Sequence, residues 1–272
     1  MLFLSTDDIS KIREGIAPYV NRSEALGLSD SGWAWDAKLD DFDNDGIPEA
    51  LQATGFIKGS SNLWPEIQEL ATANDALISS VWTSWPKIEA GADIAGHNQN
   101  PFFVRVGDHY VDIAKEIGFG EDYVSRGIAI GDVDLDGSLD LIVSNMWGPA
   151  SYYHNKRPVA GASLSLNLLL PVSQEHSDET IVYEGKQRSE IAGRAAVGAA
   201  VTVRRPDGKV LTRQVDGGNG HSGKRSPDLH FGLGDFQGTV KVEIRWRDQQ
   251  GQVHQQFFDA LSTPIGGAHR LQ

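Results

Sequence analysis

The sequence predicts a mainly β protein of the sandwich, barrel or propeller class. Short runs rich in β-branched and apolar residues, such as "LDLIVSN", "AAVTVRR" and "TVKVEIRWR", recur between turn signals. Glycine, which favours such turns, occurs 30 times. An acidic loop followed by an apolar run occurs twice, which indicates internal repetition. Short strands joined by turns are therefore expected to make up most of the fold.

The acidic loop is the first element to explain, because its like charges repel one another. Both copies read acid-x-acid-x-acid-Gly-x-x-acid. The carboxylates are Asp41, Asp43, Asp45 and Glu49 in the first copy, and Asp132, Asp134, Asp136 and Asp140 in the second. Alternating carboxylates can wrap one side of a cation, and glycine at position six permits a sharp turn. Position seven, Ile47 or Ser138, is expected to contribute its backbone carbonyl oxygen.

The ligand chemistry of these loops favours calcium. Calcium accepts many oxygen ligands in flexible geometry. A loop dense in carboxylates therefore suits calcium better than it suits magnesium or zinc. An EF-hand is excluded, because position twelve is Gln52 or Val143 and a strand-like run follows. We therefore predict two structural calcium sites whose occupation is coupled to folding. A solvated acidic turn is the alternative, and two copies in register argue against it.

One helical insertion is expected between the two loops. Asp41 and Asp132 lie 91 positions apart, whereas a four-stranded blade needs only about 40 to 50 residues. The excess sequence, at about residues 60–100, contains the clearest helix candidate, Asn62–Ser79. Its apolar residues recur at helical period, and Pro65 falls in its first turn.

A change in composition predicts two domains, residues 1–160 and 161–272. Beyond Arg157–Ser163 the acidic loops cease, and valine and glycine become more frequent. The segment "RRPDGKVL" predicts a hairpin with its turn at Pro206–Gly208. The first domain is therefore expected to hold the repeats and the insertion, and the second a small β-sandwich-like fold.

The charge balance restricts the partners of the chain. It has 24 basic and 37 acidic residues, a net charge of −13, which argues against nucleic acid and anionic membranes and suits cation binding. No apolar run approaches the roughly 20 residues of a membrane span. The start "MLFLS" is short and lacks a basic flank, so we do not interpret it as a signal peptide. A complete chain is then expected in the cytoplasm, whereas a fragment is compatible with secretion. Without cysteine, disulfides and thiolate catalysis are excluded.

Two regions resemble known families. The acidic loops, with the preceding "SGWAWDAKLDDFDNDG" and "SRGIAIGDVDLDG", resemble the FG-GAP (VCBS) calcium repeat of integrin-α β-propellers. The stretches "GRAAVGAAVTVRRPDGK", "RQVDGGNGHSG" and "LHFGLGDFQGTVKVEIRWRDQQG" resemble the ASPIC/UnbV domain. That domain follows FG-GAP repeats in proteins similar to cartilage acidic protein, and in bacterial relatives encoded in enediyne antibiotic clusters. The resemblance implies a calcium-stabilised propeller followed by a small β domain.

The number of repeats departs from this family pattern. A closed propeller has at least about four blades, whereas the chain supplies two calcium repeats. An incomplete ring exposes unpaired strand edges, which proteins rarely leave open. We therefore expect an N-terminal propeller partner chain or a homo-oligomer, and interpret "LFLS" as the last strand of a missing blade.

Function beyond calcium divides into two interpretations. The first, which we prefer because no catalytic constellation stands out, is an integrin-like interaction or ligand-binding module. The second is a biosynthetic enzyme that tailors or couples polycyclic aromatic or enediyne-type products, as the resemblance to the bacterial relatives implies. On the second interpretation His221 would transfer protons and Asp216 would orient it, although a structural glycine-rich turn is the alternative.

Other aromatic and histidine residues carry weaker signals. Trp82 and Trp85 either line a pocket for a small aromatic ligand or pack in the core. The remaining histidines lack metal-ligand spacing and are interpreted as surface or packing residues; they are His97, His109, His154, His176, His230, His254 and His269.

Overall fold

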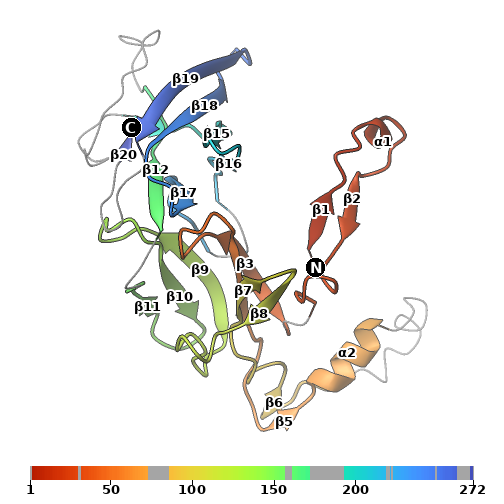
Figure 1. Ribbon diagram of the computed structural model, residues 1–272. Coiled ribbons are helices and arrows are strands. Elements are labelled where there is room, and N and C mark those ends of the chain that lie inside the picture. Colours follow the sequence, from red (N-terminus) through yellow and green to blue (C-terminus); the bar gives the residue numbers. More distant parts are fainter. Residues whose placement is uncertain are drawn as a thin grey trace. The chain divides into compact units, whose positions relative to one another are not determined.

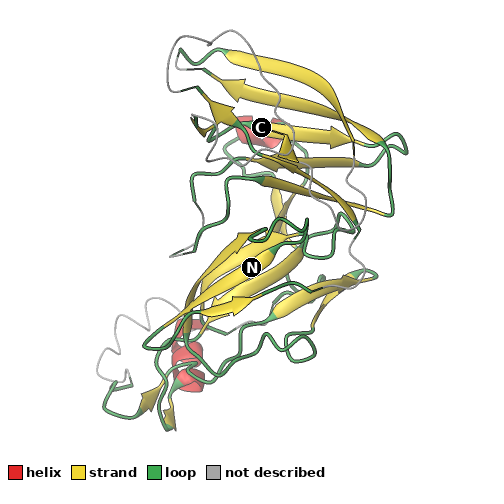
Figure 2. Cartoon of the chain, turned by 90° about the vertical axis from the view of Figure 1, so that its left-hand side faces the viewer, coloured by secondary structure: helices red, strands yellow, loops and turns green. Residues whose placement is uncertain are grey.

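Strands make up most of the regular structure in the computed structural model (Figure 1, Figure 2), which confirms the predicted mainly β class. The structure describes residues 2–29, 32–72, 86–156, 161–171, 193–218, 221, 223–248, 250–261 and 270–271. The chain forms two compact units whose segments alternate along the sequence. Unit 1 comprises Met1–Lys38, Glu49–Gly127 and Val143–Ala150, and unit 2 comprises Leu39–Pro48, Ile128–Ile142 and Ser151–Gln272. Most of each acidic loop thus belongs to the same unit as the C-terminal region, and the domain boundary at residue 160 stays a prediction.

Unit 1 contains a hairpin and a four-stranded sheet. The hairpin pairs β1 (Phe3–Ser5) with β2 (Tyr19–Asn21) in antiparallel register, and the short helix α1 (Ser10–Arg13) lies between them in sequence. The sheet has the order β3-β4-β7-β8, with the bounds Ala34–Asp40, Glu49–Thr54, Phe102–Val106 and His109–Asp112. Strand β3 enters the first acidic loop and β4 leaves it.

A helix lies in the segment where the insertion is expected, between β4 and β7. This helix, α2 (Trp64–Thr72), has Pro65 as its second residue, in agreement with the prediction. The short strands β5 (Ser61–Asn62) and β6 (Ala92–Asp93) pair in parallel on either side of it in sequence. Residues 73–79 of the predicted helix, together with Trp82 and Trp85, lie outside the described residues.

Strand β3 buries charged residues just before the first acidic loop. Its buried positions are Asp36, Lys38 and Asp40, whereas Leu39 is exposed. Lys38 Nζ forms an ion pair with Asp36 Oδ1 at 2.7 Å, and both side chains are fully buried. In unit 2, Asp40 Oδ2 faces Arg225 Nη1 at 3.3 Å. These buried carboxylates are tolerated because each has a cationic partner.

The second acidic loop has the same place between neighbouring strands. It joins β9 (Ser125–Gly131) to β10 (Asp140–Asn145), and β11 (Ser151–Tyr153) completes a sheet of order β11-β10-β9. Each acidic loop therefore connects two hydrogen-bonded neighbours, as the strand-loop-strand interpretation predicts. Among the described residues no sheet closes on itself, so the propeller remains a prediction.

The core of unit 2 is built by two sheets. One has the order β17-β12-β20, with the bounds Leu229–Gly234, Ala162–Leu166 and Arg270–Leu271; the other has the order β16-β15-β18-β19, with Val210–Gln214, Ala200–Arg204, Thr239–Arg247 and Val253–Leu261. A small pair, β13 (Leu169–Leu170) and β14 (Arg194–Ala195), adds to these. Leu164 and Phe231 from the first sheet pack in one cluster with Val201 and Val242 from the second, and all four are fully buried. This arrangement is the small sandwich-like fold expected for the C-terminal region.

Local signals of the C-terminal region also appear in the structure. The β15–β16 turn closes with a hydrogen bond from Arg205 N to Lys209 O at 2.9 Å, and Gly208 has φ of 90°. The turn predicted at Pro206–Gly208 is therefore confirmed. In β18, Val240 and Val242 point to the core while Lys241 between them is exposed, the period-two pattern of a half-buried strand.

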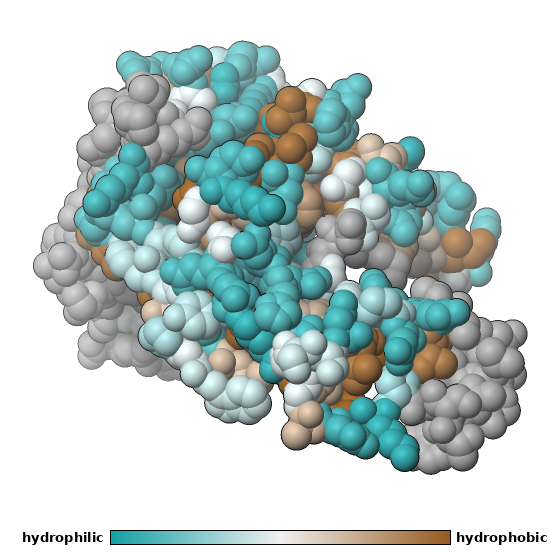
Figure 3. All heavy atoms as spheres, turned by 90° about the horizontal axis from the view of Figure 1, so that it is seen from below, coloured by the Kyte–Doolittle hydropathy of each residue, from teal (hydrophilic) through white to brown (hydrophobic). Residues whose placement is uncertain are grey.

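One face of the surface agrees with the polar composition. On the face drawn in Figure 3 the described residues are largely hydrophilic, and apolar residues form separate patches. Within the described ranges, no helix has the length and apolar character that crossing a bilayer requires.

Candidate metal centres

The two acidic loops, loop 1 (Asp41–Glu49) and loop 2 (Asp132–Asp140), follow the same backbone course. Position four is left-handed in both, with φ of 59° at Asn44 and 65° at Leu135. Position six is a left-handed glycine in both, with φ of 84° at Gly46 and 89° at Gly137. Two unrelated turns would rarely share this conformation, because left-handed residues other than glycine are uncommon.

The same internal hydrogen bonds hold both loops. The position-one carboxylate accepts from the glycine at position six: Asp41 Oδ2 from Gly46 N at 2.7 Å, and Asp132 Oδ2 from Gly137 N at 3.1 Å. The position-five carboxylate accepts from position seven: Asp45 Oδ1 from Ile47 N at 2.6 Å, and Asp136 Oδ1 from Ser138 N at 2.7 Å. Each loop thus uses one oxygen of these carboxylates to fix its backbone.

Loop 1 gathers three acidic side chains in a buried place. Carboxylate oxygens of Asp41, Asp43 and Glu49 lie within 4.8 Å of one another. Asp41 is 0% exposed, and within the described residues no group donates a hydrogen bond to its Oδ1. Burial raises the pKa of the Asp41 carboxyl to about 6, an effect larger than the opposing hydrogen bond from Gly46. A cation at Oδ1 would supply the missing partner, so this donor set fits calcium.

Loop 2 gathers a different set, and its members are exposed. Asp134, Asp136 and His154 bring their ligand atoms within 4.8 Å of one another, and His154 Nε2 lies 2.9 Å from Asp134 Oδ2. Asp140 is buried and bound by protein groups: Oδ1 accepts from Asn155 N at 2.9 Å, and Oδ2 accepts from Val133 N at 3.1 Å. Asp140 therefore fastens loop 2 to the segment after β11.

The predicted ligands are brought together only in part. Asp41, Asp43 and Glu49 meet in loop 1, and Asp134 meets Asp136 in loop 2. Asp45 and Asp132 instead show the backbone contacts described above, and the carbonyl roles of Ile47 and Ser138 stay predictions. His154 is exposed, in agreement with its interpretation as a surface or packing residue, but sequence reasoning did not place it beside Asp134. The signal available was its place one residue after β11, a strand that pairs with β10 and so returns the chain to loop 2.

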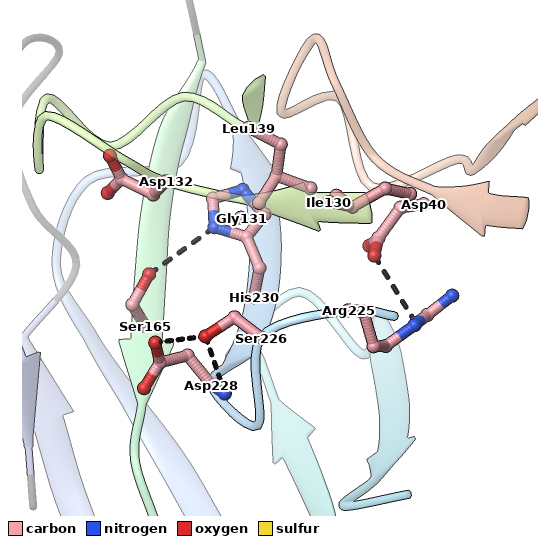
Figure 4. A pocket seen from close by; sticks show the side chains of 10 residues that line it. All are labelled: Asp40, Ile130, Gly131, Asp132, Leu139, Ser165, Arg225, Ser226, Asp228 and His230. Atoms are coloured by element: carbon pink, nitrogen blue, oxygen red, sulfur yellow. Dashed lines mark hydrogen bonds and ion pairs between the residues drawn. The ribbon is translucent and has the colours of Figure 1, made fainter. Parts of the chain in front are cut away.

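A small pocket lined by both polar and apolar residues lies where both loops begin (Figure 4). Its volume of about 20 Å³ is enough for a water molecule and too small for an aromatic ligand. Ser165 Oγ contacts His230 Nδ1 at 3.3 Å, and Ser226 Oγ donates to Asp228 Oδ2 at 2.5 Å. The full lining is Asp40, Ile130, Gly131, Asp132, Leu139, Ser165, Arg225, Ser226, Asp228 and His230.

The predicted proton-transfer pair remains untested. Asp216 accepts a hydrogen bond from Gly218 N at 3.0 Å, and its Oδ2 lies 3.6 Å from Arg225 Nε. His221 is exposed, and residues 219, 220 and 222 on either side of it lie outside the described residues, as do His176 and His269.

Comparison with known proteins identifies the C-terminal region. No curated protein sequence matches the chain. One segment of the chain matches a family; it begins shortly before β14 and ends within β19, so it covers β15 to β18 and part of β19. Residues 189–258 match the family described as ASPIC and UnbV, and the chain therefore carries a domain of that family.

Proposed function

We propose that the chain is a calcium-binding β protein in which the ion is structural and stabilises a scaffold for binding other molecules. The observation that carries this proposal is the carboxylate of Asp41, which is fully buried and has an oxygen without a hydrogen-bond donor in the described residues. An anion in this state is costly unless a cation or donor accompanies it. The neighbouring Asp43 and Glu49 supply further oxygens, which is the ligand type that calcium prefers.

Loop 2 is the second calcium site in this proposal. Its left-handed positions and internal hydrogen bonds repeat those of loop 1. Asp134 and Asp136, the carboxylates that gather in this loop, are exposed, so water competes for the ion and the site is expected to bind more weakly. The resemblance to FG-GAP repeats supports both sites and the interpretation of the two sheets as propeller blades.

The N-terminal hairpin supports the interaction part of the proposal. All residues of β1 and β2 are exposed, including Phe3 at 54% and Tyr19 at 58%, and Ile9 between the strands is 75% exposed. A two-stranded hairpin with apolar residues in water is marginally stable by itself. Further β structure, from a partner chain or a second copy, would cover these residues and pair the open edges. Sedimentation of the chain as a stable monomer with an ordered hairpin would contradict this part.

Calorimetric titration with calcium tests the metal assignment. Wild type is expected to bind two ions per chain, and Asp41→Asn, which keeps the shape and removes the charge, is expected to lose the tighter one. Asp8→Asn is the matched control, because Asp8 is an exposed aspartate outside both loops. An absence of calcium binding by the wild type, or an unchanged titration of Asp41→Asn, would overturn the proposal.

A further inference from the structure

Loop 1 packs against strand β17 of the ASPIC and UnbV domain, and Asn44 lies at the centre of the contact. Asn44 is 1% exposed and occupies the left-handed position four of the loop. Its backbone carbonyl accepts a hydrogen bond from Gly234 N at 2.6 Å, beside a register irregularity between β12 and β17. Its Oδ1 accepts from His230 Nε2 at 2.5 Å. The loop is thus bound to both ends of β17.

The contact also reaches loop 2 and fixes the state of His230. Asn44 Nδ2 donates to Gly137 O at 3.0 Å and to Gly161 O at 3.3 Å, which leaves Oδ1 as the acceptor facing His230. His230 is buried, and burial lowers its pKa to about 4, so the ring is neutral near pH 7. The neutral ring donates from Nε2 and accepts at Nδ1 from Ser165 Oγ at 3.3 Å. The side chains of Asn44, His230 and Ser165 thus form one buried series of hydrogen bonds.

Close approach of the backbone explains the glycine in the "FGLG" segment. A Cβ atom on Gly232 would lie 1.9 Å from Asp41 Oδ2 and 2.6 Å from the Cα of Asn44. The second contact is to backbone, so rotation of the Asp41 side chain alone would not relieve it. Only glycine lets β17 pass directly beneath the carboxylate that we assign to the metal.

The domain also brings positive charge to loop 1. Lys209, from the β15–β16 turn, donates from Nζ to Asp45 O at 2.8 Å. A Cβ atom on Gly46 would lie 2.4 Å from this Nζ, so the ammonium packs on the glycine at position six. Lys209 therefore restrains the middle of the loop through the backbone of Asp45.

We propose that the ASPIC and UnbV domain completes the calcium site of loop 1, with Gly232, His230 and Asn44 as positioning residues that hold Asp41 in its binding geometry. Calcium binding in loop 1 and seating of this domain then stabilise each other, because such coupling is reciprocal. The bond from Asn44 to Gly137 extends the coupling to loop 2. This inference rests on the proposed calcium function and adds to it the part of the molecule that determines affinity.

Calorimetric calcium titration of the full chain tests the inference with Gly232→Ala and a matched control, Gly217→Ala. Among the residues that the structure describes, a Cβ on Gly217 meets only Val197 Cγ1, at 3.5 Å, which is ordinary contact. Gly232→Ala is expected to weaken the tighter site by about tenfold or more, the usual effect of losing a partner that orients a ligand. The loop 2 ion is expected to remain, and Gly217→Ala to bind as wild type does.

A second variant decides the matter if Gly232→Ala does not fold. Asn44→Gly keeps the left-handed backbone and removes the side-chain bonds to His230 and Gly137, so it is expected to weaken both sites. Normal binding by folded Gly232→Ala, or by Asn44→Gly, would overturn the inference and leave the calcium function standing. A wild type that binds no calcium would overturn both.

Discussion

Loop 1 and loop 2 share one backbone conformation but differ in the burial of their side chains. Position four is the buried Asn44 in loop 1 and the partly exposed Leu135 in loop 2, although both have the same left-handed φ. The gathered carboxylates are largely buried in loop 1, whereas those of loop 2 are exposed and accompanied by His154. The repeated motif thus determines the course of the loop, while distant segments determine what a cation would meet there.

The largest expected effect comes from the buried charge of loop 1. Without calcium, Asp41→Asn should stabilise the protein near pH 7 by on the order of 2–3 kcal/mol, because it removes a carboxylate whose pKa burial raises to about 6. With saturating calcium the same variant should be less stable than wild type, because the ion loses a ligand. Urea unfolding in chelator and in calcium measures both signs. Equal effects in the two conditions would show that Asp41 does not meet the ion.

His230 gives an effect of similar size, and it concerns pH. Its folded pKa of about 4 lies below the ordinary 6.5, so the unfolded state binds the proton more readily between these values. Stability is then fully present above about pH 6.5 and is lost as pH falls towards 4, by about 3 kcal/mol in total. His230→Gln should flatten this slope, measured by unfolding at several pH values in calcium. Replacement of the exposed His109 by Gln should leave the profile unchanged, and an equal flattening there would contradict the assignment.

Loop 2 should respond more weakly. Asp134→Ala combined with Asp136→Ala should remove its ion and lower the melting temperature in calcium, by less than Asp41→Asn does. The expected loss is about 1 kcal/mol, because exposed charges are screened by water. Differential scanning calorimetry with and without calcium measures it. A larger loss than that of Asp41→Asn would reverse the ranking of the two loops.

The smallest effect comes from the side chain at position four of loop 2. Leu135→Asn should stabilise the protein by about 0.5 kcal/mol, because asparagine tolerates the left-handed conformation better than leucine does. The reciprocal change, Asn44→Leu, should destabilise strongly, because it removes the bonds to His230 and Gly137. Unfolding curves of the two variants compare the free energy from the left-handed backbone preference with that from the hydrogen bonds of Asn44 to distant residues. Similar losses in both would mean that the environment of the loops matters little.

The features that the sequence predicts correctly are local ones. The left-handed glycines Gly46 and Gly137, the turn at Pro206–Gly208 and the first turn of α2 depend on residues within a few positions of one another. The same is true of the carboxylates that meet within each loop. Such features follow from the steric preferences of glycine and proline and from short loops, which a pattern in sequence records directly.

The missed features depend on contacts between distant segments. Asn44 and His230 are 186 residues apart, and neither belongs to a recognisable motif of ligands. In the sequence, Gly232 is one glycine among many. Only its proximity to Asp41 in the structure explains why a residue without a Cβ atom is needed there. Side-chain pairs of this kind become apparent only when the strands are placed side by side.

The most direct test of the calcium site in loop 1 is a diffraction experiment on crystals grown in calcium, with anomalous scattering used to locate the ion. An anomalous peak is expected at about 2.3–2.6 Å from Asp41 Oδ1, with oxygens of Asp43 and Glu49 among the other ligands. A hydrogen-bonded water or side-chain donor at Asp41 Oδ1, with no anomalous signal in loop 1, would contradict it.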